Sequence, residues 1–308
     1  MKMLLEYNDG EHITGQFLVG NVIKGTNNLG AQYFNVELRD ASGSLSAKKW
    51  EIYPNDEEII VSGNVIEIEG EVYKYRDNLQ IKLLVANPVN IDEIDVAKFL
   101  KQPPIPKEEL IAKFNSFVDS VKEPDCKRLL DYFINKYKDK LYDYPAATFI
   151  HHEYHSGLLV HATTMAEIAD HLSKIYGINR DLIITAVLLH DFGKMTELKG
   201  PIIYKYSKEG KLLGHISIMA AEIKEAANIL KIDGEIPLLL EHCILSHHGQ
   251  YEYGSPVLPL TPEAMLLSLI DNLDSKMVIV NKALEDTKDG DFTEKITPLD
   301  NRMLYKHK

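Results

Sequence analysis

The hydrophobic pattern of this 308-residue chain changes its period once, and that change limits the folds open to it. Up to about residue 90, short runs alternate apolar and polar residues, which is typical of strands with one buried face. From residue 107 the apolar residues recur every three to four positions, which is typical of amphipathic helices. The prolines of Gln102–Pro106 (QPPIP) favour an extended backbone between the two patterns. We therefore predict a multidomain chain: an all-β domain over residues 1–90, a linker over 91–106 and an all-α domain over 107–308.

The first domain is predicted to contain five or six short strands separated by glycine-rich turns. The predicted strands cover residues 13–23, 31–39, 44–50, 61–69, 71–76 and 79–86. Asp77-Asn78 is a hairpin signal between the last two. This many short strands in about 80 residues favours a small barrel.

One segment of this domain resembles a known family of barrels. Tyr33–Gly43 (YFNVELRDASG), followed by AKKW ending at Trp50, is similar to the OB-folds of the anticodon-binding type. Such barrels bind single strands through stacked aromatic rings and a cationic groove. The candidate contacts are Tyr33, Phe34, Lys48, Lys49, Trp50, Tyr73, Lys74, Tyr75 and Arg76. For each aromatic residue, packing within the barrel is the alternative role, and the net charge of −5 over residues 1–90 opposes phosphate binding.

The second domain is predicted to be a helical bundle whose core spans about residues 145–285. The predicted helices cover residues 109–121, 125–137, 156–175, 180–190, 216–230, 237–246 and 262–284. Residues 202–213 are expected to form a short hairpin or a loop. We make no structural prediction for the polar tail after residue 286.

The segment Leu188–Lys194 (LLHDFGK) carries the strongest chemical signal in the bundle. It places His190 and Asp191 together at the end of an apolar helical run, where an imidazole and a carboxylate offer two metal ligands. His161 and Asp271 also lie in apolar helical segments. A carboxylate buried among leucines is unfavourable unless a cation compensates it, so we predict that these four residues bind a metal. Gly193 is expected to allow a tight turn after the helix.

The order of these residues along the chain resembles the HD superfamily of metal-dependent phosphohydrolases. Ten of the twelve histidines fall between residues 151 and 248, which includes the ligand positions and the doublet His247-His248. The resemblance implies that His161, His190, Asp191 and Asp271 hold a first metal, and that Asp191 bridges to a second. It implies that His215, His247 and His248 complete the second site, with support of a neighbouring ligand as the alternative for His248.

Other polar residues near the predicted ligands have less specific roles. His151, His152 and His155 either line the substrate entrance or cap a helix start. Asp274, one helical turn beyond Asp271, is expected to fix neighbouring backbone or a ligand.

The predicted ligand set indicates a chemistry as well as a metal. A nitrogen-rich site argues against magnesium or calcium alone and leaves manganese, iron and cobalt as candidates. Two cations about 3.5–4 Å apart lower the pKa of a shared water and clamp both oxygens of an in-line displacement. We therefore expect Asp191 and Lys194 to act in phosphate-ester hydrolysis, Lys194 by neutralising phosphoryl charge. The alternative for Lys194 is a solvated side chain after a helix end.

Taken together, the two domains resemble the YhaM-type 3′→5′ exoribonucleases of Gram-positive bacteria. The resemblance implies a manganese- or cobalt-dependent exonuclease that trims single-stranded RNA, with single-stranded DNA as a further substrate, to nucleoside 5′-monophosphates. One alternative is a phosphohydrolase acting on nucleotides or cyclic dinucleotides, although the Gly-Tyr-Pro signature of the latter is absent. The other is a non-catalytic accessory protein that binds nucleic acid.

The composition restricts location and partners. The net charge of −12 argues against a protein that coats nucleic acid by charge alone. Cys126 and Cys243 show neither ligand spacing nor a disulfide framework, so we expect reduced thiols in a cytoplasmic protein. The N-terminus turns polar too soon for a signal peptide, and no apolar run approaches the about 18 residues of a membrane span. No membrane partner is expected, and the sequence allows a homo-oligomer without predicting one.

Overall fold

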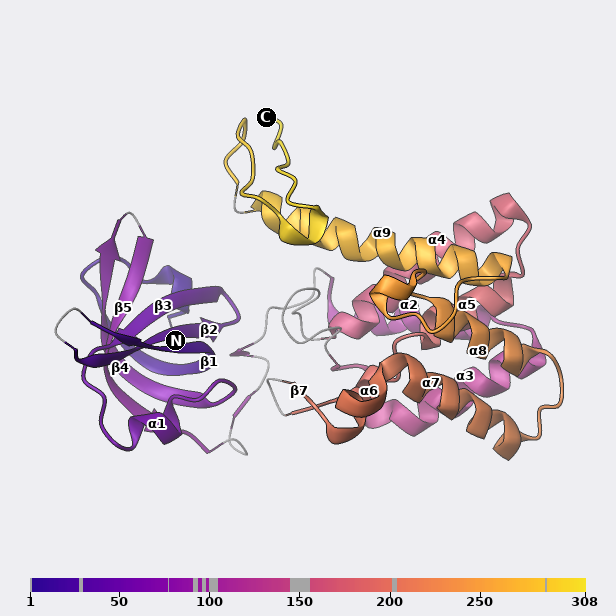
Figure 1. Cartoon of the computed structure of the whole chain (residues 1–308), viewed down its shortest axis with the longest axis horizontal. Helices are drawn as coiled ribbons and strands as arrows, with labels where there is room; N and C mark the ends of the chain where they lie inside the picture. The colour runs from indigo at the N-terminus through magenta and orange to yellow at the C-terminus, as the bar shows by residue number, and fades with distance from the viewer. Residues whose placement is uncertain are drawn as a thin grey trace. The chain divides into compact units, whose positions relative to one another are not determined.

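The computed structural model describes residues 2–27, 30–76, 78–90, 94–95, 98–99, 105–144, 156–200, 204–285 and 287–308. The chain divides into two compact units (Figure 1). Met1–Gln102 forms the main part of the first, and Pro103–Lys199 with Lys205–Lys308 forms the second. The predicted fold class, a small OB-like barrel followed by a helical domain, is confirmed.

The first unit is a closed five-stranded barrel with strand order β1-β2-β3-β5-β4. Its strands are β1 (His12–Thr26), β2 (Gln32–Asp40), β3 (Gly43–Lys49), β4 (Val65–Tyr75) and β5 (Asn78–Pro88). Neighbouring strands are antiparallel except β3 and β5, which are parallel. The long β1 pairs with β4 through its first half and with β2 through its second, with a register shift between Val19 and Val22. This change of partner closes the barrel around buried side chains such as Ile13, Leu38 and Ile66.

The barrel differs from the sequence prediction in one strand and in two short helices. The strands predicted over 61–69 and 71–76 are one strand, β4, because its ladder with β5 continues through a register shift at Gly70. A Cβ at Gly70 would lie 2.7 Å from the carbonyl oxygen of Lys82, so the close approach of β4 to β5 at this register shift needs glycine. The short helices η1 (Leu4–Glu6) and α1 (Asp56–Ile59) were not predicted. Asp77 of the predicted hairpin turn and most of the predicted linker lie outside the described residues.

The second unit is helical, and all but one of the α-helices that the structure describes in it correspond to predicted ranges; the exception covers residues 194–197. They are α2 (Lys107–Ser120), α3 (Pro124–Leu141), α4 (Gly157–Tyr176), α5 (Arg180–Leu189), α6 (Lys194–Glu197), α7 (Lys208–Leu230), α8 (Ile236–Ser246) and α9 (Pro262–Glu285). Every residue of α5 from Leu182 to Leu189 is buried, and α5 packs against α3, α4, α8 and α9. A helix that is apolar on all sides belongs at the centre of a bundle. The residues that directly follow α5 therefore lie in the interior of this unit, where His190 and Asp191 are buried.

The segment before α7 is the main departure in this unit. The strands β6 (Leu198–Lys199) and β7 (Lys205–Tyr206) form a two-stranded ladder, and α7 begins at Lys208 inside the range predicted as loop. Ser207 caps α7 by accepting a hydrogen bond from the N–H of Gly210 at 2.9 Å. Gly214 has φ 71° and ψ 155°, which interrupts the helix. Residues 201–203 lie outside the described range.

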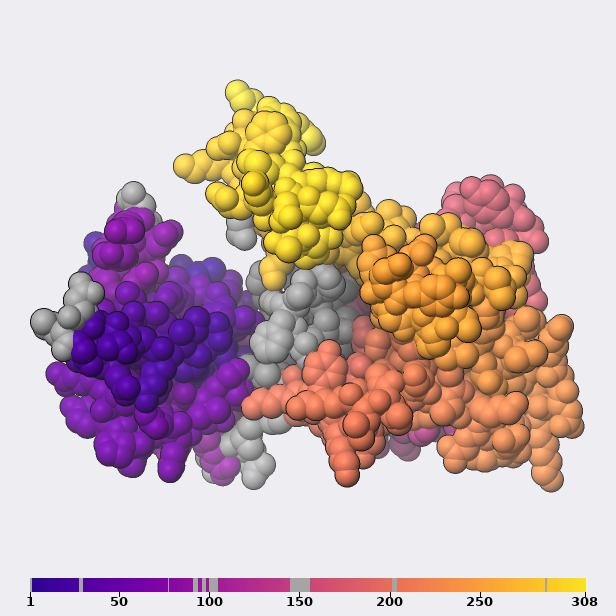
Figure 2. All heavy atoms as spheres, in the orientation of Figure 1, coloured from indigo at the N-terminus to yellow at the C-terminus, as the bar shows by residue number. Residues whose placement is uncertain are grey.

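The tail after α9 folds back on itself. Bridges pair Phe292 with Tyr305 and Ile296 with Arg302, around the short helix η5 (Thr297–Leu299). This segment, coloured yellow, projects from the packed helices of its unit (Figure 2). Among the helices that the structure describes, none combines the length and apolar character needed to cross a membrane.

Candidate metal centre and strand-binding surface

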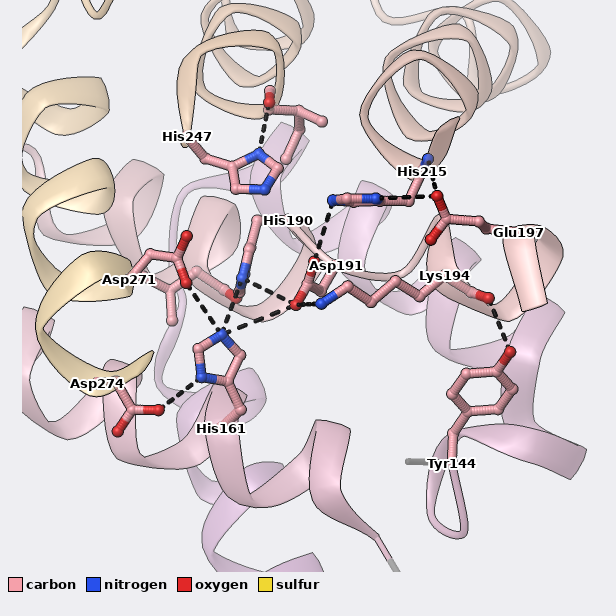
Figure 3. A network of polar contacts seen from close by, with 12 residues as sticks. Tyr144, His161, His190, Asp191, Lys194, Glu197, His215, His247, Asp271 and Asp274 are labelled. Atoms are coloured by element: carbon pink, nitrogen blue, oxygen red, sulfur yellow. Dashed lines mark hydrogen bonds and ion pairs between the residues drawn. The ribbon is translucent and has the colours of Figure 1, made fainter. Parts of the chain in front are cut away.

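All seven predicted metal ligands lie close together in the helical unit, and all of them except His248 are labelled in Figure 3. His161 comes from α4, His190 and Asp191 follow α5 directly, His215 lies on α7, His247 and His248 follow α8, and Asp271 lies on α9. Three groups of donor atoms each lie within 4.8 Å of one another: His161, His190 and Asp191; His190, His247 and Asp271; His215, His247 and His248. Shared members join these groups into one cluster.

Short distances place Asp191 between the two sides of this cluster. Its Oδ2 lies 3.4 Å from His190 Nε2 and 3.7 Å from His161 Nε2. Its other oxygen, Oδ1, lies 3.6 Å from His215 Nε2. On the first side, His161 Nε2 also lies 3.3 Å from Asp271 Oδ1. The two oxygens of Asp191 thus face different sets of imidazoles.

The hydrogen bonds of the five imidazoles define their orientation. The Nδ1 atoms of His190, His247 and His248 lie 2.8, 2.6 and 2.7 Å from backbone carbonyl oxygens, which only accept hydrogen bonds. The Nδ1 atoms of His161 and His215 face the carboxylates of Asp274 and Glu197, at 2.6 and 3.3 Å. A ring that donates from Nδ1 carries its lone pair on Nε2 when it is neutral. Each neutral ring therefore directs a nitrogen lone pair, which can ligate a metal ion, toward the cluster.

Two of these inward nitrogens, Nε2 of His215 and of His247, are buried and have no hydrogen-bond partner among the described residues. A buried polar atom without a partner is unfavourable by about 1–3 kcal/mol. A cation held by the cluster would satisfy both atoms. With five imidazoles and two carboxylates, the donor set fits a divalent transition ion better than magnesium or calcium.

The electrostatics of the cluster also fit bound positive charge. Burial opposes ionisation of Asp191, yet the Lys194 ammonium, 2.7 Å from its Oδ2, and His190 hold the pKa of this carboxyl well below its usual range. Burial opposes the charged form of His161 too, but hydrogen bonds to Asp271 and Asp274 raise the pKa of His161 to about 10. The carboxylates therefore stabilise a cation at this position, whether it is a proton or a metal ion.

The structure changes the interpretation of Gly193. Its φ of −57° is helical, so the expected tight turn is not what requires glycine here. A Cβ at Gly193 would instead lie 2.2 Å from the carbonyl oxygen of His215. Glycine allows the backbones of α6 and α7 to touch directly behind the cluster.

Two residues of the site were not singled out in the sequence. Glu197, 7% exposed, contacts both the backbone N–H and the ring of His215. The hydroxyl of Tyr144 lies 2.7 Å from the carbonyl oxygens of both Lys194 and Leu198, which holds the short helix α6 in place. Neither residue belongs to a periodic pattern or a spaced motif, so no sequence signal marked them. His151, His152 and His155 lie outside the described residues.

The barrel carries a separate cluster of aromatic and basic side chains. The rings of Tyr33 and Trp50 lie 4.8 Å apart at 35°. Lys48 Nζ lies 5.3 Å from the ring of Trp50 and 5.8 Å from those of Tyr33 and Tyr75. Arg76 lies 5.4 Å from the ring of Tyr75. Trp50 and Tyr75 are 42% and 47% exposed, so this aromatic–basic cluster has rings available at the surface.

Two candidate contacts do not belong to this surface. Phe34 is 6% exposed within the barrel core. Lys49 is 3% exposed and donates to the carbonyl oxygen of Leu84 at 2.8 Å. The expectation that these two side chains reach a bound strand does not fit their burial. Tyr73 is half-buried and donates to Gln80 Oε1 at 3.0 Å.

Comparison with known proteins identifies a domain family and a full-length relative. The model of the HD domain family matches residues 158–276. The 3′-5′ exoribonuclease YhaM of Geobacillus sp. (strain WCH70) is 40% identical over 307 residues, covering 99% of this chain and 95% of that protein. Two solved structures align with 29% of this chain. The second OB-fold domain of replication protein A from Methanococcus maripaludis has 17% identity, 94% of its own chain covered and a TM-score of 0.25. A replication protein A heterotrimer bound to single-stranded DNA has 16% identity, 64% of its own chain covered and a TM-score of 0.22. With this identity over nearly its whole length, the chain belongs to the YhaM family of 3′-5′ exoribonucleases, with an HD domain.

Proposed function

We propose that this protein is a metal-dependent exonuclease that hydrolyses single-stranded RNA from its 3′ end to nucleoside 5′-monophosphates. The observation that carries the proposal is the cluster of five imidazoles whose Nδ1 atoms are held and whose Nε2 atoms face Asp191 or one another. The name of its relative supplies the substrate and the polarity. Single-stranded DNA is a further candidate substrate. Both cysteines are free, which supports a cytoplasmic location.

The cluster divides naturally into two sets of ligands. His161, His190, Asp191 and Asp271 would hold one cation, and His215, His247, His248 with the second oxygen of Asp191 would hold another. Manganese or cobalt suits these donors, and iron is the third candidate. Bound divalent cations supply Lewis-acid activation of water and neutralise charge on the phosphate.

Lys194 is the cation that the chain itself provides. Its ammonium is held 2.7 Å from Asp191 Oδ2, and although burial opposes its charge, Asp191 raises the pKa of Lys194. It therefore remains protonated at neutral pH. We propose that Lys194 donates a hydrogen bond to a non-bridging phosphate oxygen, where charge grows as the bond to the leaving group breaks.

The aromatic–basic cluster of the barrel is the proposed binding surface for the strand. Exposed rings such as Trp50 and Tyr75 can stack on bases of any sequence, and Lys48 and Arg76 can pair with phosphates. This combination supports binding of single strands despite the acidic character of the whole domain, because the basic groups sit beside the rings.

The test is digestion of 5′-end-labelled RNA by purified protein with manganese, cobalt, iron or magnesium. We expect stepwise shortening from the 3′ end with manganese or cobalt, and resistance of 3′-blocked or fully duplex RNA. Intact RNA with every metal would contradict the proposal. Faster hydrolysis of mononucleotides or cyclic dinucleotides than of oligonucleotides would favour the small-molecule alternative, and strand binding without any hydrolysis would favour the accessory-protein alternative.

A further inference from the structure

Glu197 is a buried carboxylate that contacts the metal centre from outside the ligand set. It ends α6 and is 7% exposed. Its Oε1 accepts a hydrogen bond from the backbone N–H of His215 at 3.0 Å and lies 3.3 Å from Nδ1 of the same residue (Figure 3). A single carboxylate oxygen therefore fixes both the backbone and the ring of His215.

The backbone of α7 explains why His215 needs this contact. Gly214 interrupts α7 with φ 71°, so His215 is the first residue of a new helical segment. The first N–H groups of a helix lack intrahelical acceptors, and a negative charge near them is favourable. Glu197 thus caps this segment from another helix, and the same oxygen accepts from the imidazole.

The position of Glu197 is itself fixed by backbone contacts. A Cβ at Gly210 would lie 2.2 Å from the carbonyl oxygen of Glu197, and the N–H of Ser207 donates to that oxygen at 2.8 Å. The hydroxyl of Ser207 also donates to the carbonyl oxygen of Thr196 at 2.9 Å. Because α6 and the start of α7 are in direct contact, the carboxylate is presented to His215 from a rigid support.

The three histidines on this side of the cluster differ in the charge of their Nδ1 partners. His247 and His248 donate to neutral carbonyl oxygens, whereas His215 faces a carboxylate. A carboxylate partner fixes the tautomer of a ligating histidine and makes its other nitrogen a stronger donor. That other nitrogen, Nε2 of His215, is buried 3.6 Å from Asp191 Oδ1.

We propose that Glu197 is a positioning residue that sets the affinity of the second cation by orienting His215 and adding negative charge behind it. The inference rests on the proposed function, because it assumes the two-cation centre described above. It goes beyond that function in assigning control of one side of the centre to a residue that touches neither cation nor RNA.

The test measures manganese binding without RNA, by equilibrium dialysis and elemental analysis of the full-length protein. We expect two equivalents in the wild type, and in Glu197→Gln a second equivalent bound about 10- to 100-fold more weakly, with the first within about twofold. The amide of glutamine keeps an acceptor for the His215 N–H, so Glu197→Gln should have a Tm close to that of the wild type. Glu197→Ala should bind the second equivalent of manganese more weakly than Glu197→Gln does. Glu222→Gln is the matched control, because Glu222 is a largely buried carboxylate of the same unit that pairs with Tyr137 and Lys136 instead of a ligand.

Two further readouts separate positioning from general damage. Electron paramagnetic resonance should show a coupled manganese pair in the wild type and isolated manganese in Glu197→Gln at the same loading. Excess manganese should restore RNA hydrolysis by Glu197→Gln. The proposal is overturned if the wild type binds one equivalent, if the second equivalent is unchanged in both Glu197 variants, or if Glu197→Gln weakens both equivalents alike. Because binding is measured without RNA, a failure of the exonuclease proposal would appear in the digestion experiment instead.

Discussion

Asp274 Oδ2 lies 2.6 Å from Nδ1 of His161, and Asp274 comes one helical turn after Asp271 on α9. One helix therefore supplies both a proposed ligand and the carboxylate that orients another ligand. The spacing of three residues puts both carboxylates on the same face of α9, toward α4. His161 is thus held from both ring nitrogens by a single rigid element.

Replacing Asp274 should weaken the first cation. Asp274→Ala removes the acceptor of Nδ1, so the His161 ring loses its fixed orientation and the negative charge behind it. We expect manganese affinity for the first equivalent to fall about 10- to 100-fold, measured by equilibrium dialysis. Lys276→Ala, an exposed change on the same helix, is the control. If both variants bind manganese like the wild type, Asp274 has no role in the centre.

Replacing Asp191 should separate chemistry from strand binding. Asp191 faces both sets of imidazoles, so Asp191→Asn removes the shared negative charge while nearly preserving the side-chain volume. We expect RNA hydrolysis to fall by about 10³-fold or more, with the Kd for single-stranded RNA within about twofold of the wild type. Circular dichroism would verify the fold, since Lys194 loses its charged partner. Hydrolysis at the wild-type rate would exclude the proposed mechanism.

Replacing exposed rings of the barrel should weaken strand binding without affecting the metal centre. Base stacking contributes about 1–3 kcal/mol per base, so Trp50→Ala or Tyr75→Ala should raise the Kd for single-stranded RNA by about 5- to 150-fold. Fluorescence anisotropy with labelled RNA measures the effect, and manganese binding should stay unchanged. Tyr176→Ala removes an exposed ring from the helical unit and serves as the control. Equal Kd values for all of these variants would place the strand elsewhere.

The burial of the barrel residues shows what a strand pattern predicts and what it leaves undetermined. Alternation along a strand shows which residues share a face, but not which face is inside. Phe34 and Lys49 are adjacent to Tyr33 and Lys48, so each neighbouring pair had to divide between the two faces. The register pairs Phe34 with Lys49, and both lie in the barrel interior.

The helical unit was more predictable because its long helices carry many repeats of one period. The predicted range 237–246 differs from α8 (Ile236–Ser246) by one residue. The four-residue helix α6 shows no period, and it depends on contacts such as that of Tyr144, which is 50 residues away in sequence from Lys194. Asp191 and Asp271 were singled out because a buried carboxylate needs compensation. Asp274 was marked by its place one helical turn after Asp271, whereas Glu197, which contacts His215, carries no such signal.

The two cysteines should be unreactive in the folded protein. Burial raises the pKa of both the Cys126 and Cys243 thiols from 9.0 to about 12. The reactive thiolate is therefore scarce at pH 8, and both side chains are fully buried. We expect a thiol reagent such as dithionitrobenzoate to label neither cysteine at pH 8 until denaturant is added, and then to label both. Rapid labelling of the native protein would contradict the burial of these thiols.

The same pKa shifts make stability depend on pH. Since the folded pKa values of the two thiols lie above 9.0, these thiols contribute stability that is fully present below pH 9.0 and is lost as the pH rises toward about 12.

Adding a methyl group at Gly193 should destabilise the helical unit. A Cβ there would lie 2.2 Å from the carbonyl oxygen of His215, so Gly193→Ala forces α6 and α7 apart. Overpacking of this kind costs about 1–3 kcal/mol, which corresponds to a decrease in Tm of roughly 2–12 °C for a domain of this size. Gly234→Ala is the matched control, because its nearest atom, Asp125 Oδ2, would be at 3.5 Å, an ordinary contact. Differential scanning calorimetry should give a lower Tm for Gly193→Ala than for Gly234→Ala. The displaced His215 should also weaken the second manganese equivalent, and equal Tm values with unchanged binding would mean that the two helices do not touch as described.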